Sequence, residues 1–278
     1  MNYWYYSMYK FLVPGYYLFY SRLKSKLEKI SWFIIYIIPV YILGLFYTDY
    51  SIGIFTLFFI FSVLIFNSIY EIGYIENDIQ TIKKEKKPTL RLEKKDYIFF
   101  EENYKKVLFL KIFIAFLLLV IVYILSIYFS LDIYIFRFIS MLMIVRLMFY
   151  FHNKIRSRIN IITFFTLATT KYIMPLFLIL SPNNLVIAWM ISFLIFPLLR
   201  IMEHARKEKY ELRKWITFIG NLDLFRIKYY LFMSILTLLI YLSSQNTDIA
   251  LLHVLLVYFL IYRVASFMLV SKKIYTRK

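Results

Sequence analysis

The sequence predicts an all-α, polytopic membrane helical bundle of about eight transmembrane helices, and three observations lead to this fold class. Hydrophobic residues make up 62% of the chain, and several apolar runs approach the roughly 20 residues that cross a hydrocarbon core as a helix. Lysine and arginine gather in alternate connections between these runs, which is typical of cytoplasmic loops. The chain contains no cysteine, which excludes disulfides and thiolate metal sites.

Residues 1–30 are expected to form an interfacial segment that precedes a single transmembrane domain over 31–278. The segment is rich in tyrosine and tryptophan up to Tyr20 and becomes basic from Arg22 to Lys29. Aromatic side chains of this kind prefer the headgroup layer of a bilayer. Pro14 and Gly15 interrupt the segment, so we expect it to lie at the membrane surface and not to span it.

The remaining apolar runs divide into eight expected spans, which cover 31–47, 52–75, 107–129, 133–151, 159–180, 184–201, 222–243 and 248–270. Four connections lack lysine and arginine, and three of these hold Asp49, Asp132 and Asp248. The alternate connections are basic. The positive-inside rule therefore predicts a multi-pass protein of a bacterial inner (cytoplasmic) membrane with both termini in the cytoplasm.

The formal net charge of +18 does not indicate nucleic acid binding. A nucleic-acid-binding protein carries its cations on a soluble basic surface. Here the cations lie between apolar spans, so membrane topology explains them.

The stretch from Asn67 to Arg91 runs out of the second expected span into a basic inner loop. At about 100° per residue, one helix face would carry acids, an amide and hydroxyls, namely Asn67, Glu71, Tyr74, Asp78, Thr81 and Glu85. Such oxygen ligands suit Mg²⁺, which keeps several waters and often shares its shell with ligand phosphates. The lysines that follow suit phosphate oxygens. The alternative is that these acids and lysines only solvate an inner loop.

The end of the second span also carries a family resemblance. Asn77 and Asp78 resemble the opening of NDxxDxxxD, the first aspartate-rich motif of the UbiA superfamily of intramembrane prenyltransferases. Glu85 stands at the final acid, while Thr81 replaces the middle aspartate. Arg91, just beyond the motif, resembles the pattern of one branch of the superfamily, whose members move phosphoribose onto polyprenyl phosphate. The resemblance implies a UbiA-like fold.

It further implies that Asp78 and Glu85 are catalytic residues that bind Mg²⁺ on the diphosphate of a donor. Asn77 and Arg91 would contact the substrate. The missing middle aspartate removes one expected metal ligand, and with it either tight metal binding or catalysis.

Two later matches fall on inner loops. Tyr150 and Lys154 have the YxxxK form of the family, and one helical turn between them lets a phenol and an ammonium reach one phosphate. Arg200 and Glu203 are similar to the second motif of the phosphoribosyl branch, with Glu203 orienting the sugar or helping a second metal. For both pairs the alternative is that their charges only follow the positive-inside rule for an inner loop and have no binding role.

The cations inside expected spans include Arg137, Arg146, Lys171 and Arg263. Each costs roughly 2.5–3.5 kcal/mol at a helix centre on insertion scales. Lys171 lies in mid-span, so we expect it to face a phosphate. Arg146, with Lys154 and Lys171, would bind the 5-phosphate of the donor or the lipid phosphate, although Arg146 and Arg263 can also snorkel. Arg137 lies near the outer face and is expected to be structural.

The leading hypothesis is Mg²⁺-dependent transfer of a phosphoribosyl or related glycosyl group from a diphosphate donor to polyprenyl phosphate at the cytoplasmic side of the membrane. One alternative is a prenyltransferase with an isoprenyl diphosphate donor, although the region from Arg200 to Glu211 lacks the aspartate pair that such an enzyme needs. Another alternative is a non-catalytic lipid-handling protein derived from such an enzyme. The three histidines show no metal-ligand spacing, and His253 is expected to form an interhelical hydrogen bond.

Overall fold

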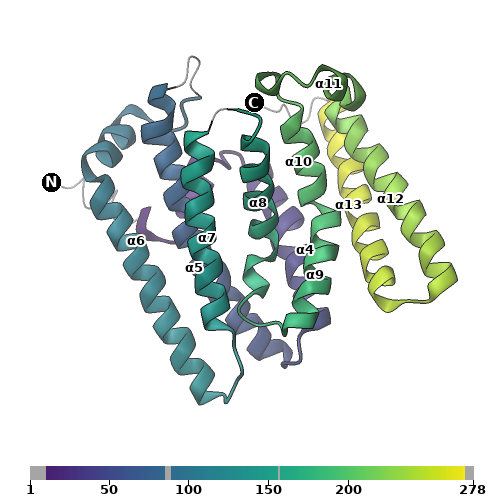
Figure 1. The fold of residues 1–278 in the computed structure, drawn as a ribbon, viewed down its shortest axis with the longest axis horizontal. Coiled ribbons are helices and arrows are strands. Elements are labelled where there is room, and N and C mark those ends of the chain that lie inside the picture. The colour runs from purple at the N-terminus through teal and green to yellow at the C-terminus, as the bar shows by residue number, and fades with distance from the viewer. Residues whose placement is uncertain (1–10, 85–88, 156, 273–278) are drawn as a thin grey trace. The chain divides into compact units, whose positions relative to one another are not determined.

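The computed structural model describes residues 11–84, 89–155 and 157–272, and within these ranges all regular secondary structure is helical (Figure 1). The chain forms two compact units, unit 1 from Met1 to Leu185 and unit 2 from Val186 to Lys278. The all-α prediction is confirmed for the described residues. That the two units act as one transmembrane domain over 31–278 stays a prediction.

Unit 1 begins with two short helices, α2 (Tyr16–Ser21) and α3 (Lys26–Trp32). Gly15 precedes α2 with a φ of +89°, a left-handed conformation that glycine adopts without steric cost. This turn lies where Pro14 and Gly15 were expected to break the segment. The Ser25 side chain accepts from the Glu28 amide while Glu28 accepts from the Ser25 amide. This capping box fixes the start of α3.

The first expected span is one continuous helical stretch in which α3 passes through a π-turn, η1 (Phe33–Ile37), into α4 (Ile38–Tyr47). It is followed by α5 (Ile52–Glu76) and a second π-turn, η2 (Asn77–Thr81). A short 3-10 turn, η3 (Ile82–Lys84), completes this stretch.

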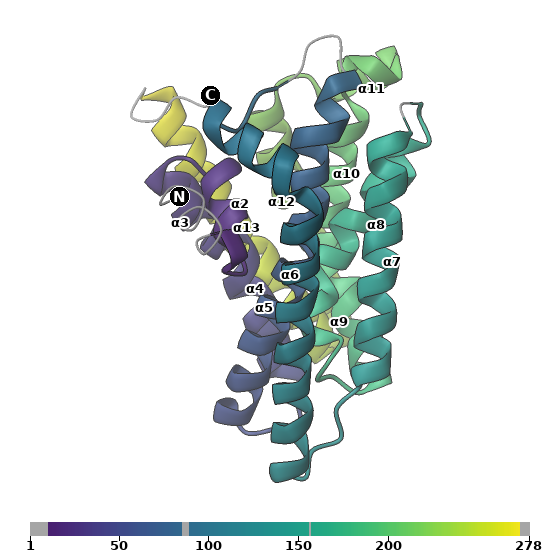
Figure 2. The same ribbon diagram turned by 90° about the vertical axis from the view of Figure 1, so that its left-hand side faces the viewer.

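The third expected span lies within α6 (Lys94–Tyr128), which begins 13 residues before the predicted start at 107. Helix α6 packs along α5, and Figure 2 shows α6 running the length of the unit. Polar residues occupy the early turns of α6, so hydropathy alone did not assign them to a helix. Aromatic side chains nevertheless bury this end against the N-terminal segment, since Phe11, Tyr17, Phe99 and Phe100 share one apolar cluster.

Helix α7 (Ile135–Lys154) packs on α5 and on α8 (Asn160–Ile173). The structure corrects the fifth expected span, 159–180, because α8 ends at Ile173 and a 3-10 turn, η4 (Met174–Leu176), follows. Pro175 has no amide hydrogen and cannot continue the α-helical bonding.

Arg137 donates two hydrogen bonds, of 2.9 and 2.6 Å, to the Phe177 carbonyl oxygen and one of 2.5 Å to that of Leu180. The side chain thereby satisfies carbonyl groups in the segment that follows η4. This is a structural role, as expected for Arg137.

Glycine allows α5 and α7 to approach closely. A Cβ atom added to Gly73 would lie 2.3 Å from the Phe149 ring, so only glycine fits at this contact.

Unit 2 contains most of a broken helix. Helix α9 (Pro182–Ile195) begins at the end of unit 1 and is followed by α10 (Pro197–Ala205), with a bend of 44° between them. Pro197 explains the break, which replaces the continuous span expected over 184–201. A 3-10 turn, η5 (Glu208–Tyr210), and α11 (Arg213–Ile219) follow.

The unit ends in a hairpin of α12 (Leu222–Ser244) and α13 (Thr247–Ser271), which lie side by side in Figure 1. Asn221 and Asn246 cap the two helices by accepting hydrogen bonds from backbone amides of the first turn, and such caps stop a helix from fraying. His253 Nδ1 lies 3.0 Å from the Ser234 carbonyl oxygen across the hairpin, which confirms the expected interhelical hydrogen bond.

In the described residues, six helices are long and apolar enough to cross a membrane, or up to seven if α9 and α10 form one span. The chain is therefore a polytopic helical membrane protein by the length and composition of its helices. The expected number of about eight was too high, since the apolar run at 159–180 does not form one long helix.

Candidate functional site

The polar face of α5 and η2 points into unit 1. Asn67, Glu71, Asp78 and Thr81, which the helical projection placed on one face, are all buried. Buried carboxylates in a membrane bundle need hydrogen-bond donors. The residues that supply these donors therefore determine whether the polar face can bind a metal ion or another ligand.

Asp78 lies at the centre of the candidate site and is only 2% exposed. Its Oδ1 accepts from Arg22 Nη2 at 2.9 Å and from Arg91 Nη1 at 3.3 Å, and its Oδ2 accepts from the Tyr17 hydroxyl at 2.8 Å. The Asn77 amide also reaches Oδ1, at 3.3 Å. Burial and the Asp78 carboxylate raise the pKa of Tyr17 well above its ordinary value. The phenol therefore stays protonated and donates to Asp78.

Mg²⁺ was expected at Asp78, and the described residues do not fit it. Both oxygens of Asp78 already accept from protein donors, and two of these are cationic guanidinium groups that repel a divalent ion. The described part of the chain holds no group of three or more His, Asp or Glu side chains that could bind a metal ion. Glu85, the second expected ligand, lies outside the described residues.

Arg146 was expected to contact phosphate, and it is paired within the protein instead. Its Nη1 and Nη2 donate to the two oxygens of Glu76, at 3.1 and 2.7 Å. The Tyr104 hydroxyl donates to the same carboxylate at 2.6 Å. Such a bidentate pair joins α5, α6 and α7. Sequence reasoning missed Glu76, although it directly precedes the Asn77-Asp78 pair.

A second buried ion pair joins α5 and α6 deeper in the unit. Lys111 Nζ donates to Glu71 Oε2 at 2.7 Å, and the Leu18 amide donates to Glu71 Oε1 at 2.7 Å. The side chains of Lys111 and Glu71 are at most 1% exposed. Both charges are neutralised, so this pair stabilises the fold and fastens α2 to α5.

Lys171 is different, because no carboxylate among the described residues pairs with it. It lies in the last turn of α8, with its ammonium 5.3 Å from the Tyr36 ring centre and 5.7 Å from that of Tyr70. The Tyr36 hydroxyl is buried and has no hydrogen-bond partner in the described residues. Unit 1 thus holds a buried hydroxyl without a hydrogen-bond partner in the described residues, next to a partly exposed ammonium that pairs with no carboxylate there.

The aromatic surroundings of Lys171 continue toward Asp78. The Tyr70 and Tyr74 rings meet edge to face with their centres 5.1 Å apart, and the Arg22 guanidinium lies 4.6 Å from the Tyr74 ring centre. Cations are attracted to the faces of such rings. Tyr70 and Tyr74 therefore separate two cationic positions, one at Lys171 and one at Arg22.

The Tyr150–Lys154 pair forms as the spacing predicts. Lys154 Nζ donates to the Tyr150 hydroxyl at 3.1 Å and lies 5.3 Å from the centre of its ring. Both side chains are exposed near the end of α7, so the pair lies on the surface of the unit.

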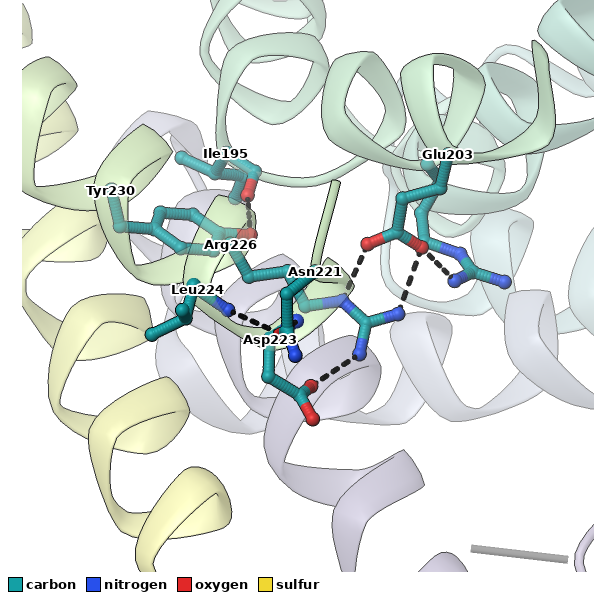
Figure 3. Close-up of polar contacts among 8 residues, drawn as sticks. Ile195, Glu203, Asn221, Asp223, Leu224, Arg226 and Tyr230 are labelled. Carbon is teal, nitrogen blue, oxygen red and sulfur yellow. Dashed lines mark hydrogen bonds and ion pairs between the residues drawn. The ribbon is translucent and has the colours of Figure 1, made fainter. Parts of the chain in front are cut away.

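In unit 2, Glu203 is surrounded by arginines (Figure 3). Arg226 donates to its two oxygens at 2.5 and 3.0 Å and also pairs with Asp223 at 3.1 Å. Arg200 donates to Glu203 as well. The sequence spacing had associated Arg200 with Glu203. It did not reveal Arg226, which lies in a different helix, α12.

The predicted site residues are thus brought together only in part. Asn77, Asp78 and Arg91 meet, and Lys171 lies in the same unit beyond the tyrosines. Arg146 and the Tyr150–Lys154 pair are engaged with other residues of unit 1, and Arg200 and Glu203 belong to unit 2. Comparisons with family models, curated proteins and solved structures gave no match.

Proposed function

We propose that this membrane protein binds a polyprenyl phosphate within unit 1, with the lipid phosphate next to Lys171. The observation that carries this proposal is the Lys171 ammonium, which lies among tyrosine rings without a carboxylate partner in the described residues. Although α8 is not among the candidate membrane spans, placing an ammonium among aromatic side chains costs part of its hydration energy. A bound anion would offset that cost.

The surroundings of Lys171 favour a lipid phosphate. A phosphate offers several acceptor oxygens, which suits both an ammonium and the partnerless Tyr36 hydroxyl. The ligand must also reach the position between apolar helices, which a lipid does from the bilayer. Tyrosine rings pack well against an isoprenoid chain, because their faces are apolar.

The reaction that the UbiA resemblance suggests is transfer of a phosphoribosyl or related glycosyl group from a diphosphate donor. The contact of Asp78 with Arg91 supports it, since two residues of the matched motif meet. The lipid phosphate would be the nucleophile and is already ionised at neutral pH. Lys171 would hold it in place until the donor arrives. Mg²⁺ has no part in this proposal, because the described residues do not fit a divalent ion.

A specific observation favours the non-catalytic alternative, in which the protein only holds the lipid. Both carboxylate oxygens of Asp78 already accept hydrogen bonds, from Tyr17, Arg22 and Arg91. In addition, Thr81 replaces an acid of the motif. Transfer of an isoprenyl group is less supported. Arginines donate hydrogen bonds to Glu203, and the region from Arg200 to Glu211 contains no aspartate pair.

The test combines binding and turnover with purified protein in lipid nanodiscs. Binding of a labelled polyprenyl phosphate is compared between the wild type and Lys171→Met, which keeps much of the side-chain volume but removes the charge. We expect binding to weaken about tenfold or more, the usual effect of losing a charged contact. Exposed Lys154→Met is the matched control and should change binding less than twofold.

Turnover then distinguishes the three functions. Labelled phosphoribosyl diphosphate that gives lipid-linked label supports phosphoribosyl transfer, and isoprenyl diphosphate that reacts with a small acceptor supports prenyl transfer. Lipid binding without turnover supports the non-catalytic role. If Lys171→Met binds the lipid as tightly as the wild type, the proposed site is wrong.

We also propose that the protein lies in a bacterial cytoplasmic membrane with both termini inside. The alternation of basic and lysine-free connections supports this orientation.

A further inference from the structure

We infer that Arg22 and Arg91, arranged by Asp78, form a second anion site in unit 1 that binds a phosphate or diphosphate group without a divalent cation. The inference goes beyond the proposed lipid site, because it concerns a different pair of cations and a water-soluble phosphorylated ligand. It reverses the expected role of Asp78, from metal ligand to positioning residue.

The geometry shows how Asp78 holds the two arginines. One oxygen, Oδ1, accepts from Arg22 at 2.9 Å and from Arg91 at 3.3 Å. Tyr17 fixes the other oxygen at 2.8 Å, which sets the orientation of the carboxylate. The two guanidinium groups are therefore held near each other, although they come from the N-terminal segment and from the loop before α6.

The charge of the cluster points to an anion. Two guanidinium groups share one carboxylate, which leaves a net charge of +1 at a carboxylate that is 2% exposed. The nearby acids of α5 pair with other cations, Glu76 with Arg146 and Glu71 with Lys111. Moreover, Arg22 Nη1 is buried without a hydrogen-bond partner in the described residues. A phosphate oxygen would satisfy this donor.

The position of the cluster indicates a ligand that arrives from water. Arg91 lies in the connection between η3 and α6, and its side chain is 32% exposed, whereas that of Arg22 is 15% exposed. Arginine binds phosphate groups through two parallel N–H donors. A phosphorylated sugar or a diphosphate could thus contact Arg91 at the surface and Arg22 beneath it.

The experiment measures binding of inorganic pyrophosphate to the full chain in nanodiscs by calorimetry, in EDTA and again with Mg²⁺. We expect the wild type to bind in EDTA. Arg22→Gln and Arg91→Gln should each weaken binding about tenfold, while Arg22→Lys should retain more affinity than Arg22→Gln. Asp78→Asn keeps the shape of the carboxyl group and should still bind in EDTA.

Two controls separate this site from other cations. Lys83→Gln removes an exposed charge from η3, just before this connection. It should change pyrophosphate affinity less than twofold, which tests for general electrostatic attraction. Lys171→Met should also leave it unchanged, so failure of the lipid site and failure of this site are distinguishable. Arg91→Gln tests the same site if an Arg22 variant misfolds, because Arg91 lies in a connection and its side chain is 32% exposed.

Binding that requires Mg²⁺ and disappears in Asp78→Asn would show that Asp78 is a metal ligand, and the inference would be overturned. Absence of binding in both conditions would also overturn it. Equal affinity of the wild type and both arginine-to-glutamine variants would place the pyrophosphate elsewhere.

Discussion

Charged side chains in unit 1 divide into those that are neutralised within the fold and those that are not. Glu71 with Lys111 and Glu76 with Arg146 are pairs, whereas Lys171 has no carboxylate partner among the described residues. Arg146 and Lys171 were recognised from the sequence as cations within apolar runs, but Lys111 was overlooked. The sequence did not predict their partners, since Arg146 and Glu76 lie 70 residues apart and no local pattern relates them.

The role of Asp78 illustrates the same limit. Helical periodicity placed this residue on one face with Asn67 and Glu71. The contact with Arg22, however, depends on the N-terminal segment folding back across α5, a long-range contact that spacing does not encode. Tyr17 was likewise an interfacial aromatic residue in the sequence and is a hydrogen-bond donor to Asp78 in the fold.

The buried Glu71–Lys111 pair gives a prediction for stability. Lys111→Met leaves the Glu71 carboxylate buried with only backbone donors, which should cost about 3–5 kcal/mol. The double variant Glu71→Gln, Lys111→Met should recover much of this loss, because neither charge then remains. Unfolding in detergent by denaturant measures both. Additive losses in the double variant would contradict the pairing.

At the scale of elements, helix boundaries were predicted well where polar caps end an apolar run. Helices α12 and α13 match their expected spans within one residue, and each begins at an asparagine cap. Predictions failed where proline breaks an apolar run, at α8 and between α9 and α10. A hydropathy window averages over the break and reports one span.

The contact between α5 and α7 gives a prediction about packing. Gly73→Ala would place a methyl group against the Phe149 ring, and such overpacking typically costs 1–3 kcal/mol. We expect a lower midpoint of thermal unfolding in detergent. Gly53→Ala is the matched control in the same helix, because nothing lies within 4 Å of its added Cβ. If the two substitutions change the unfolding midpoint equally, helix propensity and not packing against Phe149 determines the effect.

At the scale of the whole molecule, the positive-inside pattern predicts an orientation for every span. The chain contains no cysteine, which makes this orientation simple to test. Single cysteines placed at Asp49, Asp132 and Asp248 should react with a membrane-impermeant maleimide added outside intact cells. Cysteines at Glu102 and Lys209 should react only after the cells are opened. The opposite labelling of even one of these loops would require a different topology.

The length of α6 has a consequence for the bilayer around the protein. At 1.5 Å per residue, its 35 residues extend about 52 Å, whereas the hydrocarbon core is about 30 Å thick. About 20 Å of helix therefore lies beyond the core, with aromatic residues on its buried side and lysines on its exposed side. The overhang carries Lys94, Lys95, Lys105 and Lys106, and a charged side chain inside the hydrocarbon core costs roughly 2.5–3.5 kcal/mol. When the bilayer thickens, α6 therefore cannot cover the added hydrocarbon with this end, and the bilayer must become thinner around it. The protein should accordingly lose stability in membranes of long acyl chains.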